Sequence, residues 1–198
     1  MMIHIRRGNF ARWRVAMAAA ILTMLAALAV TAAATTLARM SVAQMSRAAQ
    51  VIVRAQCEAN ATGWDAGEIW TFTTFEVEEV WRGEASAQIS VRLLGGRAGN
   101  VTSSVAGIPR FRPGEEVVLF LERTERGDFS IVSWEQGTFR IRRDIGTGGE
   151  SATQDTAALA TFDPGTRRFE AGGIVHTPVD FLHAQVDAAL SNGSGRKP

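Results

Sequence analysis

The chain of 198 residues is poor in the residues that form cross-links and nucleophilic sites. Its single cysteine, Cys57, excludes a disulfide bond within the chain. Tyrosine is absent, and only two of the three histidines, His176 and His183, lie beyond the N-terminal segment. No G-x-S-x-G motif supplies a serine nucleophile. Because nucleophilic catalysis needs a serine or cysteine beside a base, the sequence predicts no catalytic residues, and it suggests no cofactor.

Positive charge is also scarce once the N-terminus is set aside. The chain has 21 basic and 20 acidic residues, for a formal net charge of +1. Four arginines lie within residues 1–14, and every acidic residue lies beyond residue 34. The remaining residues therefore hold 17 basic and 20 acidic side chains, a net charge of −3. A protein that follows a phosphate backbone needs a basic surface, so we expect no nucleic-acid partner.

The N-terminal segment has the organisation of an export signal. Residues 1–14 are basic, residues 15–34 carry no charge, and Ala32-Ala33-Ala34 matches an A-x-A cleavage site. The sequence therefore predicts a signal peptide over residues 1–34 and a domain exported to the periplasm or the extracellular space. The alternative is an uncleaved anchor, because residues 15–34 are long enough to span a bilayer. In that case we expect membrane contact through this segment alone.

Beyond residue 34 the sequence predicts one mainly β domain, residues 35–190, and a disordered tail, residues 191–198. Runs of β-branched and aromatic residues indicate short strands. They lie at residues 51–57, 68–81, 89–93, 117–121, 129–134 and 138–143. The run 117–121 is apolar at every position, which predicts a strand buried on both faces. We expect loops around Trp64 and over the glycine-rich connection 95–114, and we expect 144–175 to be mostly loop with one weak strand.

The longest predicted strand, residues 68–81, changes its apolar face along its length. Trp70 and Phe72 share one parity, Phe75 and Val77 share the other, and Val80 returns to the first. Side chains alternate between the two faces of a strand, so a change of parity indicates a bend or a bulge. Strands bend in this way where a sheet closes into a barrel.

Two helices are predicted to flank the strands. Residues 41–50 begin with Ser41 and have Gln44 three positions later, which is the pattern of a capping box. Residues 178–190 carry four apolar residues at helical spacing. These are Phe181, Leu182, Val186 and Leu190. Short strands, one of them bent, and two flanking helices together predict a small Greek-key barrel of the OB type.

Three segments resemble the N-terminal domain of tissue inhibitors of metalloproteinases and the wider netrin-like module. They are AQVIVRA at 49–55, TFEVEEVWRG at 74–83 and GEEVVLFL at 114–121. They are similar to the first, second and fourth strands of that family, and a Gly-Asp turn follows the third segment as it does there. The resemblance implies an OB-type barrel and, as partner, an exported protein such as a metalloprotease. The chain also resembles a group of small exported bacterial proteins without an established activity.

The chain departs from those inhibitors at their inhibitory ridge. There an N-terminal cysteine, held by disulfides, presents its amine and carbonyl to the zinc of the protease. This chain has no cysteine before the first predicted strand, and the predicted helix 41–50 stands in that place. Cys57 does not match the family's cysteine. The chelating mechanism is therefore not implied for this chain.

Three patterns suggest chemistry that commoner explanations account for. Cys57 could serve a small hydrolase, but on a β-branched strand we expect it to be a buried hydrophobic residue. A metal site would need more ligands than His176, Asp180 and His183. The adhesion tripeptide at residues 126–128 falls where a hairpin turn favours Gly-Asp in any case.

The sequence is best interpreted as an exported binding module with a protein partner. The candidate binding residues are Trp64, which we expect to be exposed in a loop, Trp70 nearby, and Arg97 and Arg110 in the glycine-rich connection. OB barrels bind through loops and one sheet face, which is where these residues are expected. The alternatives are a small hydrolase and a structural envelope protein that has no discrete ligand.

Overall fold

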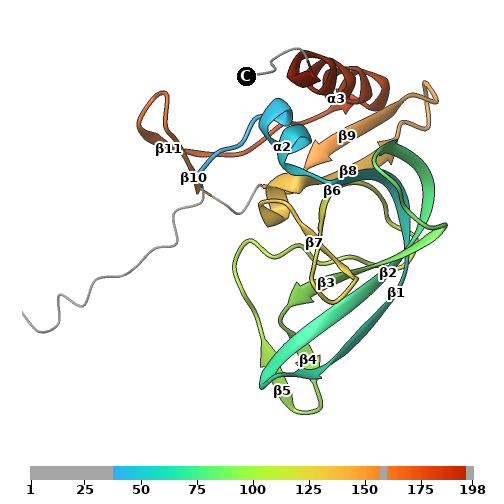
Figure 1. The fold of residues 1–198 in the computed structure, drawn as a ribbon, viewed down its shortest axis with the longest axis vertical. Helices are drawn as coiled ribbons and strands as arrows, with labels where there is room; N and C mark the ends of the chain where they lie inside the picture. Colours follow the sequence, from blue (N-terminus) through green and yellow to red (C-terminus); the bar gives the residue numbers. More distant parts are fainter. Residues whose placement is uncertain (1–37, 157–159, 195–198) are drawn as a thin grey trace, which may run out of the picture. The chain divides into compact units, whose positions relative to one another are not determined.

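The computed structural model describes residues 38–156 and 160–194, so the predicted signal segment 1–34 lies outside it. Its strands are β1 (Val51–Asp65), β2 (Glu68–Arg82), β3 (Gln88–Leu94), β4 (Gly96–Ala98), β5 (Val101–Ser103), β6 (Glu116–Arg123), β7 (Phe129–Ile131), β8 (Thr138–Arg143), β9 (Glu150–Gln154), β10 (Ala160–Asp163), β11 (Arg168–Ala171) and β12 (Thr177–Pro178). Its helices are α2 (Val42–Ala48), the 3-10 helix η1 (Trp134–Gly137) and α3 (Val179–Ser194). The prediction of a mainly β fold with a short helix before the strands and a C-terminal helix is confirmed (Figure 1). Within the described residues no helix is long and apolar enough to cross a membrane.

Five strands pair in a closed circuit, which we call the five-stranded ring. β1 pairs with β2, β2 with β3, β3 with β7, β7 with β6, and β6 with β1. Every pair is antiparallel except β3–β7, which is parallel and rests on one residue pair, Val91 opposite Phe129. From β6 the sheet continues through β8 and β9 to β12. The junction of β3 and β7 is therefore the shortest pairing in the ring.

Two hydrophobic cores lie on opposite faces of β1 and β6. One core contains alternate residues of β1, among them Val53, together with Leu119 of β6 and Phe75 of β2. The other contains Ile52 and Phe120 and packs against residues of α2 and α3. Residues 117–121 are fully buried, so the prediction of a strand buried on both faces is confirmed.

The predicted capping box of α2 is present. The side chain of Ser41 accepts a hydrogen bond from the backbone N–H of Gln44, and the side chain of Gln44 accepts one from the backbone N–H of Ser41. These bonds satisfy two N–H groups that the first turn of a helix leaves without partners. Met45 is then fully buried against the second core.

The prediction for α3 is correct in its buried face and wrong in two details. Leu182 and Val186 are buried, but Phe181 is 57% exposed, because the sheet contacts the helix on the side of Leu182. The helix also continues to Ser194, so residues 191–194 are helical rather than a disordered tail. Residues 195–198 lie outside the described part of the chain.

β2 pairs irregularly with β1 at three places, but its buried face changes only beyond Phe75 and not between Phe72 and Phe75. Trp70 and Phe72 do not mark a change of face, because Ile69, Thr71, Thr73 and Phe75 form one continuous buried row on the other side. Two of the four inward positions carry threonine, so the row could not be recognised from apolar residues alone. The change occurs farther along. The register with β1 skips Glu78 and then Trp81, which are bulged residues, and Trp81 joins the core under the helices.

The loop predicted around Trp64 is instead part of a long β-hairpin, visible in Figure 1 as the ribbon of β1 and β2. Trp64 lies in β1 opposite Ile69, and the turn consists of Ala66 and Gly67 alone. Both turn residues have positive φ, 50° and 85°, which is the backbone of a two-residue hairpin loop. The polar segment before the turn is extended because β2 pairs with it along its whole length.

Three other loop or strand boundaries were predicted wrongly. The connection 95–114 contains the hairpin β4–β5, which pairs over three residues. The strand predicted at 129–134 ends at Ile131, because Ser133 and Trp134 adopt left-handed backbone and begin η1. The segment 144–175 contains β9, β10 and β11 rather than one weak strand.

Candidate functional site

A cleft of about 440 Å³ opens between the tips of two hairpins of the ring. The β1–β2 hairpin contributes Asp65 and Glu68, and the loop between β6 and β7 contributes Arg126. Between them, Trp70 of β2 and residues 92–94 of β3 line the cleft, with Ile131 of β7 and residues 108 and 134 on its apolar side. The cleft therefore lies at the seam where β3 and β7 share a single residue pair.

Trp70 and Arg92 form the centre of the cleft wall. The guanidinium carbon of Arg92 lies 4.1 Å from the centroid of the Trp70 ring and 5.6 Å from that of Phe72. The strand register explains this stack, because Phe72 is opposite Arg92 and Trp70 is opposite its neighbour Leu94. The Arg92 side chain is only 11% exposed. A cation held over an aromatic face away from water is attracted more strongly than an exposed one, so this stack fixes the position of both side chains.

Ion pairs connect the two hairpin tips across the cleft. Arg92 donates to a carboxylate oxygen of Asp65 at 2.8 Å, and the exposed Arg126 donates to the same oxygen. The Nε atom of Arg92 also lies 3.8 Å from a carboxylate oxygen of Asp128. Asp65 is thus shared by an arginine of β3 and an arginine of the β6–β7 loop, and the two tips are held together by charge.

The same ion pairs involve both charged residues of the tripeptide at residues 126–128. Arg126 pairs with Asp65. Asp128 is mostly buried, accepts a hydrogen bond from the hydroxyl of Thr124 and lies close to Arg92. Both charged ends of the tripeptide are therefore engaged within the chain, and these residues act here as part of a turn and a cleft wall.

The four candidate residues from the sequence are not gathered into one site. Trp70 lines the cleft. Trp64 is 60% exposed, as expected, but it does not line the cleft, although the next residue, Asp65, does. Arg110 contacts the hydroxyl of Thr71 at 3.3 Å, which lies on the opposite face of β2 from Trp70. Arg97 is exposed on β4 and donates to the carbonyl of Gly99 at 3.3 Å.

Sequence reasoning missed Asp65, Arg92, Arg126 and Trp134 as cleft residues. A signal for Arg92 was present, since Ile89, Val91 and Leu93 alternate with it and place it on the outer face of β3. The pairing register of β2 with β3, which brings Arg92 beside Trp70, could not be predicted from the local sequence.

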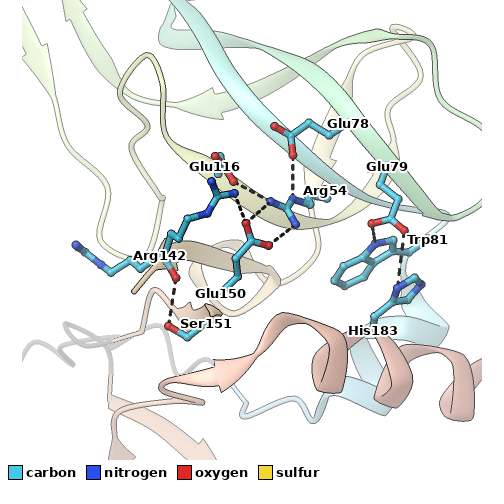
Figure 2. A network of polar contacts seen from close by, with 10 residues as sticks. Arg54, Glu78, Glu79, Trp81, Glu116, Arg142, Glu150, Ser151 and His183 are labelled. Carbon is cyan, nitrogen blue, oxygen red and sulfur yellow. Dashed lines mark hydrogen bonds and ion pairs between the residues drawn. The ribbon is translucent and has the colours of Figure 1, made fainter. Parts of the chain in front are cut away.

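A second polar cluster surrounds Arg54 at the other end of the β1–β2 ribbon (Figure 2). Arg54 donates hydrogen bonds to three carboxylates: Glu78 at 2.9 Å, Glu116 at 3.0 Å and Glu150 at 2.7 Å. These residues come from β1, β2, β6 and β9, and the Arg54 side chain is 18% exposed. Each carboxylate is already paired, so we assign this cluster to the stability of the sheet rather than to ligand chemistry.

A neighbouring group fastens α3 to β2. The ring of His183 stacks on that of Trp81 with centroids 4.3 Å apart and an angle of 6° between the planes. The indole N–H of Trp81 donates to Glu79 at 2.8 Å (Figure 2). His183 also lies 3.9 Å from oxygens of Glu79 and Asp187. This histidine therefore contacts a tryptophan and two carboxylates, with neither a serine nor the cysteine among these partners.

Cys57 is almost completely buried, as predicted for a small hydrophobic residue. Burial raises the pKa of its thiol. A thiol with a raised pKa that solvent does not reach is a poor nucleophile, so the position of Cys57 does not favour the hydrolase alternative. Among residues 38–156 and 160–194, no three histidine, cysteine or acidic side chains are placed to hold a metal ion.

The Arg54 cluster makes the stability of the protein sensitive to acid. Hydrogen bonds from Arg54 and Arg143 lower the pKa of Glu150 from its ordinary value of 4.5 to about 2. Because the pKa is lower in the folded state, this stabilisation is complete above pH 4.5 and is lost as the pH falls towards 2. We expect a loss on the order of 2 kcal/mol in the free energy of unfolding. Urea titrations at pH 7, 4 and 2.5 measure it.

Glu150→Gln is the control for this pH dependence, since it keeps the shape and removes the titrating group. The difference in stability between the original chain and the Glu150→Gln chain should shrink as the pH falls through that window. A difference that stays constant from pH 7 to 2.5 would contradict the assigned role of Glu150.

Comparison of the chain with protein-family models and with curated protein sequences finds no match.

Proposed function

We propose that this chain is an exported binding module of the OB type whose ligand site is the cleft between the β1–β2 and β6–β7 tips. The strand order of the ring, β1–β2–β3–β7–β6, with a parallel junction between the third and the last strand, supports the OB assignment. OB barrels bind ligands on the face of the second and third strands and on the loops after the first and fourth strands. The stack of Trp70 on Arg92 lies on that face between those two loops, and it carries the proposal.

The composition of the cleft supports a protein as the partner. Tryptophan and arginine are enriched at the residues that contribute most to protein–protein binding. Here a tryptophan and two arginines, Arg92 and Arg126, stand beside an apolar wall that includes the half-exposed Trp134. The resemblance to metalloproteinase inhibitors makes an exported metalloprotease the first partner to test, by contact with the cleft and not by chelation. Residues 1–34 supply the export signal in this proposal.

Trp70→Ala is expected to weaken binding of the partner by at least about tenfold, because it removes a central aromatic residue and releases Arg92. The chain serves as bait for the exported fraction of the cells that produce it. Captured proteins are identified by mass spectrometry, and their affinities for both variants are then measured by calorimetry.

Phe169→Ala is the control, because Phe169 is also an exposed aromatic side chain, 61% exposed, on β11 outside the cleft. It should bind the captured protein as the original chain does. Thermal unfolding shows whether each variant is folded. Equal affinities of the folded Trp70→Ala and Phe169→Ala chains would remove the cleft from the proposal.

A further inference from the structure

The two edges of β3 differ in how far they are paired. On one side, β3 pairs with β2 at every position from Gln88 to Leu94. On the other side, it pairs with β7 at one position, Val91. Beyond that position, the end of β3 lines the cleft together with Ser130 and Ile131 of β7. A sheet edge with unpaired main-chain groups is a template for a further strand.

The phase of the β2–β3 ladder shows which groups are unpaired. In an antiparallel pair, alternate residues direct their N–H and C=O groups to the partner strand, and the residues between them direct these groups away. The N–H of Gly95 donates to the carbonyl of Ile69 at 2.6 Å, so the odd-numbered residues of β3 bond to β2. Leu94 therefore turns its N–H and C=O away from β2, where no strand of the described residues pairs with them.

The side chains around this edge indicate what kind of chain fits it. The wall facing the edge is apolar and includes Ile131 and Trp134. Two acidic residues, Asp65 and Glu68, and two basic residues, Arg92 and Arg126, line the cleft, and both arginines pair with Asp65. Glu68 is exposed and forms no ion pair with another described residue. The carboxylate of Glu68 therefore complements a basic side chain of a ligand.

We propose that the cleft binds an extended polypeptide segment as an added β-strand on the free edge of β3, with an apolar side chain against Trp134 and a basic side chain near Glu68. This inference rests on the proposed function and specifies its ligand. The main-chain groups of Leu94 supply the hydrogen bonds, and the cleft supplies the selectivity, as in other cases of strand addition. An oligosaccharide could stack on the tryptophan rings, but it has no peptide backbone to pair with the main-chain N–H and C=O groups of Leu94.

The test uses a defined peptide. Twelve-residue peptides from a random phage-displayed library are selected on the full-length chain and counter-selected on the Trp70→Ala chain. The tightest peptide is synthesised, and a series is made in which one backbone amide at a time is N-methylated. Strand addition predicts a loss with a period of two residues: methylation of amides directed to β3 raises Kd by about tenfold or more, and methylation of the intervening amides changes it by less than about twofold.

A variant of the chain checks the same bond from the other side. Leu94→Pro removes the N–H that faces the cleft and leaves the β2–β3 hydrogen bonds in place, because proline is accepted where the N–H faces away from the sheet. It should weaken the peptide by about tenfold, whereas Leu94→Ala, which keeps the N–H, should bind within about threefold. The methylated peptides remain informative if Leu94→Pro does not fold.

The outcomes separate the two proposals. A cleft-dependent peptide that loses affinity without any alternation along its backbone would overturn strand addition and leave the binding cleft in place. A selection in which no peptide depends on Trp70 would overturn both. Alternating losses together with retained binding by Leu94→Ala would establish the added strand.

Discussion

Replacing Arg54 by methionine is expected to lower the free energy of unfolding by about 3 kcal/mol. The substitution leaves Glu78, Glu116 and Glu150 close together without the cation that pairs with all three. Removing one partner from a buried ion pair costs more than the pair itself contributes, because it leaves uncompensated charge away from water. The glutamates are partly exposed, which places the expected loss at the lower end of the range for buried pairs.

Arg143→Met is the matched control for Arg54→Met. Arg143 also pairs with Glu150, at 2.6 Å, but its side chain is 66% exposed. Exposed ion pairs contribute little, so we expect Arg143→Met to lower the free energy of unfolding far less than Arg54→Met does. Urea denaturation at pH 7 followed by circular dichroism measures both variants. Losses of equal size would show that burial of Arg54 does not determine the role of the cluster.

The Arg54 cluster and the cleft stand at the two ends of β1. The first part of the strand, Val51 to Ala55, is largely buried, and the part from Glu58 to Asp65 is mostly exposed. Few apolar contacts and exposed backbone are the physical basis of low local stability. The ribbon therefore has a firmly held base and a tip whose position depends on the ion pairs of Asp65. A ligand at the cleft meets the end of the ribbon that is easier to rearrange.

Local pattern was sufficient to predict the elements that bury large apolar side chains. Residues 117–121 are apolar throughout and form the strand shared by both cores. The capping box of α2 is likewise local, because Ser41 and Gln44 are three residues apart. Where inward positions carry small or polar residues, the alternation of apolar and polar residues is absent, and the strand could not be predicted. In β9, Ala152 and Gln154 are buried, and the amide of Gln154 is satisfied by the carbonyl of Gln136 at 2.5 Å.

The cleft could not be predicted in the same way, because its geometry depends on contacts that are distant in the chain. Arg92 meets an aspartate 27 positions away, and Arg126 meets the same aspartate across 61 positions. The sequence named Trp70 as a candidate binding residue, but its partners follow from the closure of the five-stranded ring. Arg97 and Arg110 were chosen for their place in a glycine-rich segment, but Arg97 contacts the carbonyl of Gly99, and Arg110 contacts Thr71 on the other face of β2.

Gly83 occupies the crowded turn between β2 and β3 with a φ of +75°, in the left-handed region. A Cβ atom at this position would overlap the carbonyl oxygen of Gln50 and lie 3.2 Å from a methyl group of Val51. Gln50 has little freedom to move, since its N–H donates to the carbonyl of Leu121 at 2.8 Å. In a residue with a Cβ atom, backbone strain and overlap would therefore act together here, two residues after the bulge at Trp81.

Gly83→Ala is expected to destabilise the protein by about 2–4 kcal/mol, from about 1–2 kcal/mol of left-handed backbone strain and a similar cost for the overlap. Gly127→Ala is the control, because Gly127 has a φ of +87° but nothing within 4 Å of its added Cβ. The control should carry the backbone strain alone. Chemical denaturation of both variants separates the two contributions by subtraction. If the two losses are equal, the close approach of Gln50 to Gly83 is relieved at no cost, and the turn is less rigid than its packing implies.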